Sequence, residues 1–523
     1  MTQPFDARPN GPPKPPYLIA VDSGLTVTKA VVFDAAGRSL SVASAEVPQL
    51  MPQPHHVERD MSALWRAAAR SIGEAVAQAA IDEAEIAAIS VTGHGDGVYL
   101  IDHDRAPLGP AVLSLDSRAG GIVLDWEQRR VNAEALAVTG QTPMIAAPAA
   151  ILAWIQRHEP ERFARIGWAL SCKDWLRLCL TGEVATDPTE ASTSFTAVET
   201  QGYSRDALRL FGLEALEGRL PDILPSTATA GKVTPEAADA SGLPAGLPVV
   251  VGLHDVTAAA VGLGMIELGD LAMVAGTYSI NETILDAPLR DRDYFCRNAV
   301  EPGRWMAMAI SPASSANIDW FLKVFCAAEL AEAETVGDSI FDRLEPEIAA
   351  AFAEDEAAED GAVVYHPFLF GSPHGPAASG AFLGLRGWHG RGTVMRAILE
   401  GIVFNHRTHV DALRRRVPLR RARLAGGSAR SGRMVQLFAD TLGMPVETVD
   451  AEEVSALGAA LCAGVACGLY DDLASAVAAS VTVKRGWQPD AGATAALEAR
   501  FAHYRATIEA MTPIWNRLAG QED

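Results

Sequence analysis

The chain has 523 residues, of which 49% are hydrophobic and 21% are charged. This length exceeds what one hydrophobic core usually organises, so we expect two or more domains and little disorder outside the termini. Asp and Glu number 65 against 43 Lys and Arg, a formal net charge of −22, and a surface this acidic argues against nucleic acid and membrane-surface partners.

The first residues and the cysteines indicate the cellular compartment in which we expect the protein. Residues 1–16 are rich in proline and lack the apolar core of a signal peptide, so we expect a disordered leader. The six cysteines are scattered without a CxxC pair and predict neither a disulfide framework nor a zinc site. No apolar run is long enough to cross a bilayer. We therefore expect a soluble, cytoplasmic protein.

Strand and helix patterns alternate along the chain. The predicted elements, in order, are a strand hairpin over 17–40, a helix over 61–80, a strand over 86–91, a second hairpin over 269–285, helical sequence after 391, and strands near 421–425 and 446–449. Because the second half opens in the same style as the first, we expect a duplicated α/β core with a border near 262–269.

The turn of the first hairpin is a candidate phosphate site. Asp22 lies at a strand end, where a carboxylate can hold Mg²⁺ through water, and Gly24 lets the backbone approach an anion. The Thr26 hydroxyl and the Lys29 ammonium group would contact phosphate oxygens. An ordinary hairpin turn accounts equally well for these residue types.

Two later turns have a similar character. Gly276 and Thr277 form a small, hydroxyl-bearing turn in the second hairpin, and Gly426, Gly427 and Ser428 lie between a strand and a helix. Glycine-rich strand-to-helix turns accept a phosphate or a flat base against their backbone amides. Such turns are also common without a ligand.

Asp255 ends an apolar strand and precedes an alanine-rich helix that begins near Thr257. A carboxylate beside a glycine-bearing turn suits a general base that takes a proton from a hydroxyl group. An aspartate at a helix N-cap is the competing interpretation, and position alone slightly favours it.

A second polar turn contains His94, Gly95 and Asp96 and is followed by Asp116 and Arg118. These groups could hydrogen-bond a polyol, or Asp116 and Arg118 could form a surface ion pair. The glycine pattern leads into a strand and is therefore no dinucleotide fingerprint. No P-loop, HExxH motif or GxSxG elbow is present.

Together, these segments resemble the FGGY family of carbohydrate kinases, within the actin/Hsp70/sugar-kinase superfamily. The resemblance runs from about Tyr17 to Leu518 and is strong through the order and spacing of the segments. They are VDSGLTVTKAVVFD, SVTGHGDGVYLID with SLDSR, SCKDWLRLCLTGEVATDPTEAS, VVVGLHDVTAAAVG, VAGTYS, RAILEGIVFN and AGGSARSGRMVQLFADTLGMPVETVDAEEVSALGAA.

The resemblance implies an α/β, two-domain actin/Hsp70/sugar-kinase-like fold with duplicated ribonuclease-H-like cores. Residues 17–264 would bind sugar and phosphate, residues 265–523 would bind nucleotide, and both substrates would lie in the cleft between these domains. It also implies the following roles: Asp22 orders Mg²⁺; Gly24, Thr26 and Lys29 surround the transferred phosphoryl; Gly276 and Thr277 contact the nucleotide phosphates; Gly426, Gly427 and Ser428 pack on adenosine; Asp255 is the base; and His94, Gly95, Asp96, Asp116, Arg118 and His254 contact the sugar.

Asp96 departs from relatives at this position, since glycerol kinases carry Glu and D-xylulose kinases carry His. The segments at 172–175 and 186–192 look most like erythritol kinases, with L-xylulose kinases close behind. The resemblance therefore implies ATP-dependent phosphorylation of a terminal hydroxyl of a small polyol or ketose. Family members acting on D-xylulose or glycerol are the alternative.

An actin-like or Hsp70-like ATPase switch is the alternative from another class. Asp96, Asp116 and Arg118 argue against it, because a switch needs no sugar contacts. The expected partners are a sugar or polyol and ATP, with no nucleic acid and no membrane, and a homodimer is left open.

Overall fold

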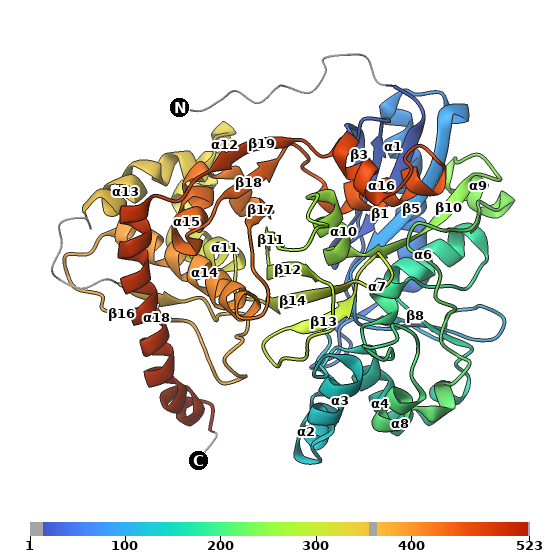
Figure 1. Ribbon diagram of the computed structural model, residues 1–523, viewed down its shortest axis with the longest axis horizontal. Coiled ribbons are helices and arrows are strands. Elements are labelled where there is room, and N and C mark those ends of the chain that lie inside the picture. Colours follow the sequence, from blue (N-terminus) through green and yellow to red (C-terminus); the bar gives the residue numbers. More distant parts are fainter. Residues whose placement is uncertain (1–13, 355–362, 521–523) are drawn as a thin grey trace. The chain divides into compact units, whose positions relative to one another are not determined.

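The computed structural model describes residues 14–354 and 363–520 (Figure 1). Residues 1–13 of the expected leader lie outside the described part of the chain. The chain forms two compact units, the first made of Met1–Leu268, Thr283–Met308 and Asp450–Thr482, and the second of Gly269–Glu282, Ala309–Val449 and Val483–Asp523. The units are thus interleaved in sequence, and the domain border expected at 264–265 stays a prediction.

The first unit is built on a six-stranded sheet of order β3-β2-β1-β5-β10-β9. Its strands are β1 (Tyr17–Ser23), β2 (Val27–Phe33), β3 (Ser39–Glu46), β5 (Ile86–Gly93), β9 (Thr229–Lys232) and β10 (Pro248–His254). β1 and β2 form the predicted antiparallel hairpin, whereas β1, β5 and β10 run parallel. The carboxyl ends of these three central strands therefore meet at one edge of the sheet.

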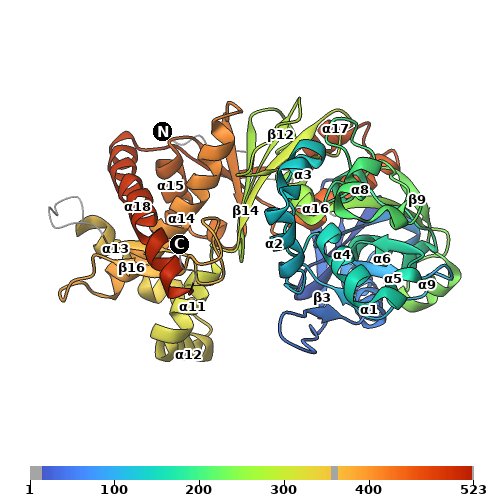
Figure 2. The ribbon, with the colours of Figure 1, turned by 90° about the horizontal axis from the view of Figure 1, so that it is seen from below.

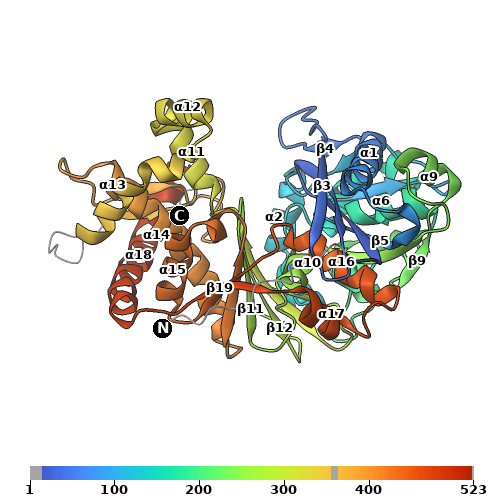
Figure 3. The same cartoon turned by 90° about the horizontal axis from the view of Figure 1, so that it is seen from above.

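Helices cover both faces of this sheet, as Figure 3 shows. They are α1 (Met61–Ala79), α6 (Cys172–Thr181), α9 (Pro235–Ser241), α10 (Asp255–Gly262) and α16 (Val454–Ala466). Side chains alternate along β1, so that Ile19 and Val21 pack in one core with α1 and α6, while Leu18 and Ala20 pack in another with α10 and α16. This period of two is the pattern expected of a strand buried on both faces.

A third core lies among short helices at one end of the first unit (Figure 2), and it includes Trp126, Leu152 and Phe211. The other elements of this unit are β4 (Glu58–Arg59), η1 (Glu83–Glu85), β6 (Tyr99–Ile101), β7 (Ala111–Val112), α2 (Gly120–Gln128), α3 (Val131–Thr139), α4 (Pro148–His158), α5 (Pro160–Ala164), β8 (Trp168–Leu170), α7 (Pro188–Ala191), α8 (Arg205–Phe211), η2 (Glu214–Leu216), β13 (Phe295–Asn298) and α17 (Leu473–Ser480).

The second sheet has the order β13-β14-β12-β11-β17-β18-β19. Its further strands are β11 (Asp270–Ala275), β12 (Ser279–Leu285), β14 (Trp305–Ser311), β17 (Arg421–Ala425), β18 (Val446–Val449) and β19 (Val483–Trp487), and a small separate sheet joins β15 (Val364–His366) and β16 (Ala381–Leu383). The helices of the second unit are α11 (Ala316–Phe325), α12 (Ala327–Val336), α13 (Ile340–Glu354), α14 (Arg391–Arg414), η3 (Gly427–Arg430), α15 (Gly432–Leu442) and α18 (Ala491–Leu518). The strand positions predicted at 421–425 and 446–449 are confirmed.

The long helix α14 carries polar side chains into the core of the second unit. The Asn405 amide donates hydrogen bonds of 3.0 Å to the hydroxyl oxygens of Ser279 and Ser311. These bonds tie the start of β12 to the end of β14, and they satisfy groups that would be costly to bury alone.

No helix in the described ranges is long and apolar enough to cross a membrane. The six cysteines are all unpaired.

Candidate active site

The carboxyl ends of β1, β5 and β10 bring three predicted groups together. In the strand register Ser23 and His254 both lie opposite Gly93. Asp22 near the end of β1, the polar turn after β5, and Asp255 after β10 therefore converge. Carboxyl edges of parallel strands are where open α/β sheets bind ligands.

Asp255 is the first residue of α10, and His254 occupies the N-cap position without a side-chain capping bond. The N-cap interpretation of Asp255 is therefore wrong, although its carboxylate accepts a 2.8 Å hydrogen bond from the Val256 amide. The side chain is 29% exposed. Removal from water, reinforced by the negative charge of Asp22, raises the pKa of Asp255 to about 7.

Asp22 lies opposite Lys29 in the first hairpin. Burial raises the pKa of Asp22 to about 6, with Lys29 opposing the shift and Glu453 adding to it. The Lys29 ammonium group donates to both Glu453 oxygens, at 2.9 and 2.8 Å. Sequence reasoning missed Glu453, because nothing in its acidic segment distinguishes it from its neighbours.

The carboxyl groups near Asp22 suit a divalent cation. Asp22 lies near Lys29 and Glu453, and its negative charge also acts on Asp255. Within the described chain no cluster of three or more His, Cys, Asp or Glu side chains is arranged to hold a metal by itself. Mg²⁺ matches such a place, because it keeps several waters and is usually held by one or two carboxylates together with substrate phosphates.

Arg59 is a second residue that the sequence did not single out. It is buried, and its guanidinium group donates to the carbonyl oxygen of Gly24 at 3.2 Å and to that of Leu25. The turn is also closed by a 3.0 Å bond from the Gly24 amide to the Val27 oxygen. These bonds from Arg59 and Gly24 fix the hairpin turn, and Thr26 at its tip is exposed.

The turn after β5 is shaped by close backbone approach. A Cβ atom at Gly95 would come within 1.6 Å of His254 Nε2, so only glycine fits beneath that ring. His94 contacts the Tyr99 hydroxyl at 3.0 Å through Nε2, and burial, with help from Arg59, lowers its pKa to about 4. His94 is therefore neutral at pH 7.

Asp96 adopts a left-handed conformation, with φ of 57°. Its carboxylate accepts hydrogen bonds of 3.3 and 3.4 Å from Arg297, whose Nε also donates to Gln141 at 3.1 Å. A further 3.4 Å contact joins Arg297 to His254 Nε2. Arg297 and Gln141 were missed, since both lie in stretches without a recognisable motif.

Asp116 and Arg118 pair with each other, as one of the two interpretations expected, but the pair is buried and not on the surface. Arg118 donates to both Asp116 oxygens, at 2.9 and 2.8 Å, and to Glu58 at 2.7 Å. Asp116 also accepts from the Val57 amide at 2.7 Å. Their contact with substrate stays a prediction.

The two glycine-containing turns of the second unit lie against one another. A Cβ atom at Gly426 would approach the Ala275 carbonyl oxygen to 2.6 Å. Ser315 donates from its amide to the Gly276 carbonyl oxygen at 2.9 Å, and its hydroxyl contacts the Ser428 hydroxyl at 3.1 Å. Thr277 and Gly427 are exposed beside these contacts, so backbone and hydroxyl groups are available to a phosphate.

Comparison with known proteins decides the family. The model of the N-terminal domain of the FGGY family of carbohydrate kinases matches residues 17–262, and the model of its C-terminal domain matches residues 271–467. The chain belongs to the FGGY family of carbohydrate kinases. This confirms the resemblance inferred from the sequence motifs, and with it the carbohydrate kinase class and the two-domain sugar-kinase fold.

Individual relatives agree with this assignment. The chain is 31% identical to the L-xylulose/3-keto-L-gulonate kinase of Escherichia coli K12, covering 96% of this chain and 98% of that protein. It is also 31% identical to the erythritol kinase of Brucella abortus, with the same coverage. Among solved structures, the xylulose kinase of Rhodospirillum rubrum superposes with a TM-score of 0.84 at 28% identity, covering 96% of this chain and all of that one.

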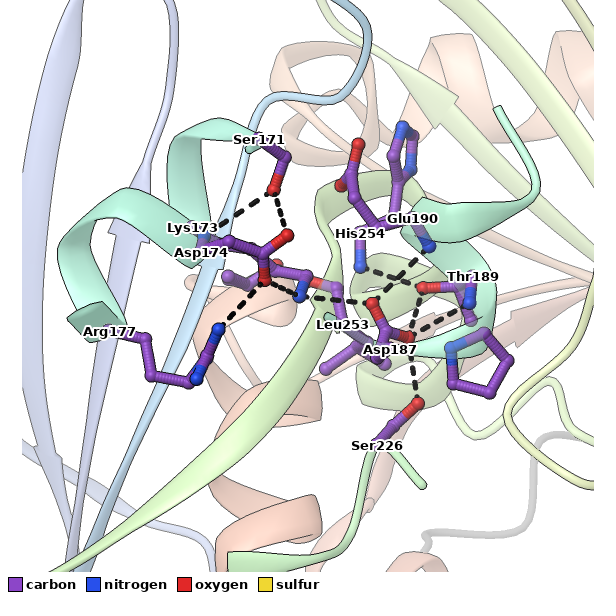
Figure 4. A network of polar contacts seen from close by, with 12 residues as sticks. Ser171, Lys173, Asp174, Arg177, Asp187, Thr189, Glu190, Ser226, Leu253 and His254 are labelled. Atoms are coloured by element: carbon purple, nitrogen blue, oxygen red, sulfur yellow. Dashed lines mark hydrogen bonds and ion pairs between the residues drawn. The ribbon is translucent and has the colours of Figure 1, made fainter. Parts of the chain in front are cut away.

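In this FGGY kinase a buried ionic network lies beside Leu253 and His254 at the end of β10 (Figure 4). Lys173 contacts Asp174 at 2.7 Å and Asp187 at 3.0 Å, and all three side chains are almost inaccessible to water. Burial alone would lower the pKa of Lys173, but the neighbouring carboxylates raise it above its ordinary value. The network is linked to the end of β10, because the Thr189 hydroxyl donates to Asp187 and accepts from the His254 amide. As a family member the protein is a sugar or polyol kinase with ATP as co-substrate.

Proposed function

We propose that the protein transfers the γ-phosphoryl group of ATP to a terminal hydroxyl of a four- or five-carbon polyol or ketose of the erythritol or L-xylulose type. Asp255 is the general base. The observation that carries this proposal is the placement of Asp255 at the start of α10, beside the turn that contains His94 and Asp96, with a pKa raised to about 7. A base with a pKa near the working pH combines a large ionised fraction with useful proton affinity.

The charge around Asp96 argues for an uncharged substrate. Asp96 and Arg297 neutralise one another, and burial keeps both His94 and His254 uncharged because it lowers their pKa values. A sugar acid would meet the Asp96 carboxylate without a spare cation. The erythritol kinase relative is named for a neutral compound of this size, whereas the name of the Escherichia coli relative includes both neutral L-xylulose and the sugar acid 3-keto-L-gulonate, so the acid belongs in the test below.

The transfer itself needs little covalent chemistry from the protein. The substrate hydroxyl gives its proton to the Asp255 carboxylate, and its oxygen forms a bond to the γ-phosphorus as the bond to the β,γ-bridging oxygen breaks. The products are the phosphate ester, ADP and protonated Asp255, which then releases its proton to water. Catalysis rests on positioning and on neutralising the charge of the phosphoryl oxygens.

The other predicted residues would bind the phosphates, the metal ion and the nucleotide. Lys29 and the Gly24 and Thr26 turn would face the transferred phosphoryl group, and Asp22 would hold Mg²⁺ through water. Mg²⁺ supplies charge neutralisation on the nucleotide phosphates. In the second unit, Gly276, Thr277 and the 426–428 turn would bind the nucleotide.

The test is ADP release from Mg·ATP with erythritol, threitol, L-xylulose, D-xylulose, ribulose, ribitol, glycerol and 3-keto-L-gulonate. Asp255→Asn should lower the sugar-dependent rate by about 100- to 10,000-fold and leave a measurable residual rate, whereas Asp82→Asn, a conservative change at an exposed helix cap, should leave the rate unchanged. Turnover of a neutral tetritol or pentulose that falls in this way only in the Asp255 variant supports the proposal. ADP release that no sugar stimulates, or that Asp255→Asn leaves undiminished, would refute it.

A further inference from the structure

The peptide between Leu253 and His254 is held by two threonine side chains. Thr92 donates from its hydroxyl to the Leu253 carbonyl oxygen at 2.7 Å, and the His254 amide donates to the Thr189 hydroxyl oxygen at 2.9 Å. Both threonines are buried. This peptide lies one peptide unit before Asp255, so the two bonds hold the end of the strand from which that residue emerges.

β10 needs this support because its pairing with β5 is irregular. The register shifts between Val250 and Leu253, and Gly252 has a left-handed φ of 74°. A Cβ atom at Gly252 would lie 1.9 Å from the Val91 carbonyl oxygen, so the two strands approach too closely there for any other residue. A bulge of this kind re-aims the residues that follow it.

The Thr189 hydroxyl has a fixed direction. It donates its only hydrogen to Asp187 at 2.6 Å, which leaves its oxygen to accept from the His254 amide (Figure 4). Asp187 is fully buried, and it also accepts from Ser226 at 2.8 Å and is paired with Lys173 at 3.0 Å. The chain of contacts therefore runs from a buried ammonium group, through a carboxylate and a hydroxyl, to the backbone beside the proposed base.

We propose that Thr189 is a positioning residue, whose hydroxyl, oriented by Asp187, holds the His254 backbone so that the Asp255 carboxylate faces the substrate hydroxyl. This inference rests on the proposed function of Asp255. Proton transfer to a general base depends steeply on geometry, and a displacement of about 1 Å can cost about 100-fold in rate.

The test compares Thr189→Val, which keeps the shape of the side chain but removes its hydroxyl, with Thr189→Ser, which keeps the hydroxyl. Thr181→Val is the matched control, because the buried Thr181 hydroxyl also donates one bond, to Arg177 O at 2.8 Å, and accepts one, from the Glu183 amide at 3.0 Å. The substrate is the most active compound of the panel above.

We expect Thr189→Val to lower kcat by about 10- to 100-fold, with the KM for ATP unchanged, while Thr189→Ser stays within about threefold of wild type. Thr181→Val should lower the melting temperature by a similar amount without this loss of kcat. Placed in an Asp255→Asn background, Thr189→Val should cause no further loss, because two residues that act through one group are not additive.

Equal kcat values for Thr189→Val and Thr181→Val would overturn the inference, as would a full further loss in the Asp255→Asn background. If Thr189→Val does not fold, Thr92→Val removes the other half of the same support, and a wild-type kcat for that variant would overturn the inference. An Asp255→Asn enzyme with undiminished activity would instead refute the proposed base itself, so the two failures can be told apart.

Discussion

At the residue scale, Asp255 and Asp22 are two buried carboxyl groups with raised pKa values. Burial raises both pKa values, to about 7 for Asp255 and about 6 for Asp22, and the negative charge of Asp22 adds to the shift of Asp255. The free enzyme at neutral pH therefore holds a fraction of these groups protonated.

This pair predicts the pH dependence of the reaction. Since the base must be ionised, kcat/KM for the sugar should rise with pH through about 7 and level off above pH 8. A pH–rate profile at saturating Mg·ATP measures this midpoint. A rate that is flat between pH 5.5 and 8.5, with the chemical step shown to limit turnover, would contradict the assignment.

The same shift has a consequence for stability. The folded pKa of Asp255 lies above the ordinary value of 3.8, so the folded state binds the proton more tightly, and ionisation costs stability as pH rises from about 4 to about 7. At about 1.4 kcal/mol per pKa unit, Asp255→Asn should therefore raise the free energy of unfolding by up to about 4 kcal/mol at pH 8. Denaturant titrations should show this gain shrinking toward pH 4, and a gain that is equal at both pH values would contradict the cause.

The pairing of Asp96 with Arg297 predicts how specificity can be changed. Asp96→Asn leaves the Arg297 guanidinium group without its carboxylate partner, since the bonds of 3.3 and 3.4 Å both end on Asp96. The ratio of kcat/KM for 3-keto-L-gulonate to that for L-xylulose should rise by about tenfold or more, because a substrate carboxylate can now meet the freed charge. An unchanged ratio in steady-state kinetics would show that neither group contacts the substrate.

At the element scale, the strand–turn–helix segment at β17 and α15 depends on one glycine. Gly426 has φ of 87° and lies against the Ala275 carbonyl oxygen. Gly426→Ala should push this turn away from Gly276 and raise the KM for ATP by about tenfold, through about 1.4 kcal/mol of lost binding.

The matched control for that change is Gly432→Ala, at the first residue of α15, where an added Cβ atom meets nothing within 4 Å. Its KM for ATP should equal that of the wild type. Isothermal titration with ADP gives the same comparison without turnover, and equal ADP affinities in both variants would remove the 426 turn from the nucleotide site.

Some elements could be predicted from the sequence, and some contacts between them could not. The hairpin at β1 and β2 was predictable because alternation of β-branched residues around a small polar turn is a local signal. The Lys29–Glu453 pair joins residues 424 positions apart, and Arg297 reaches Asp96 across 201. Such contacts depend on how the chain returns to the first unit, and no local pattern encodes that return.

The position of Asp255 shows the same limit on a smaller scale. Its place between a strand and a helix was read correctly, yet the choice between an N-cap and a base needed the backbone conformation of His254. The glycines at 95 and 252 are likewise visible in the sequence, but the residues they approach, His254 and Val91, come from other strands.

At the scale of the whole molecule, the net charge of −22 acts on the nucleotide. Mg·ATP is itself an anion, so long-range repulsion should weaken its binding at low salt. Raising the ionic strength from 10 to 150 mM shortens the screening length from about 30 to about 8 Å. The KM for ATP should therefore fall several-fold, while that of a neutral sugar stays constant, and a KM for ATP that rises with salt would contradict this.

The interleaved chain also bears on how the protein is made. The first unit includes Asp450–Thr482, and α16 from that segment covers the face of the sheet formed by Leu18, Ala20 and Val250. A ribosome adds about 5–20 residues per second. This apolar face therefore stays uncovered for roughly 10–40 s between the synthesis of residue 268 and that of its covering helix. The nascent first unit is thus a natural client for chaperones, and truncation after the N-terminal family domain should yield an aggregating fragment instead of a sugar-binding one.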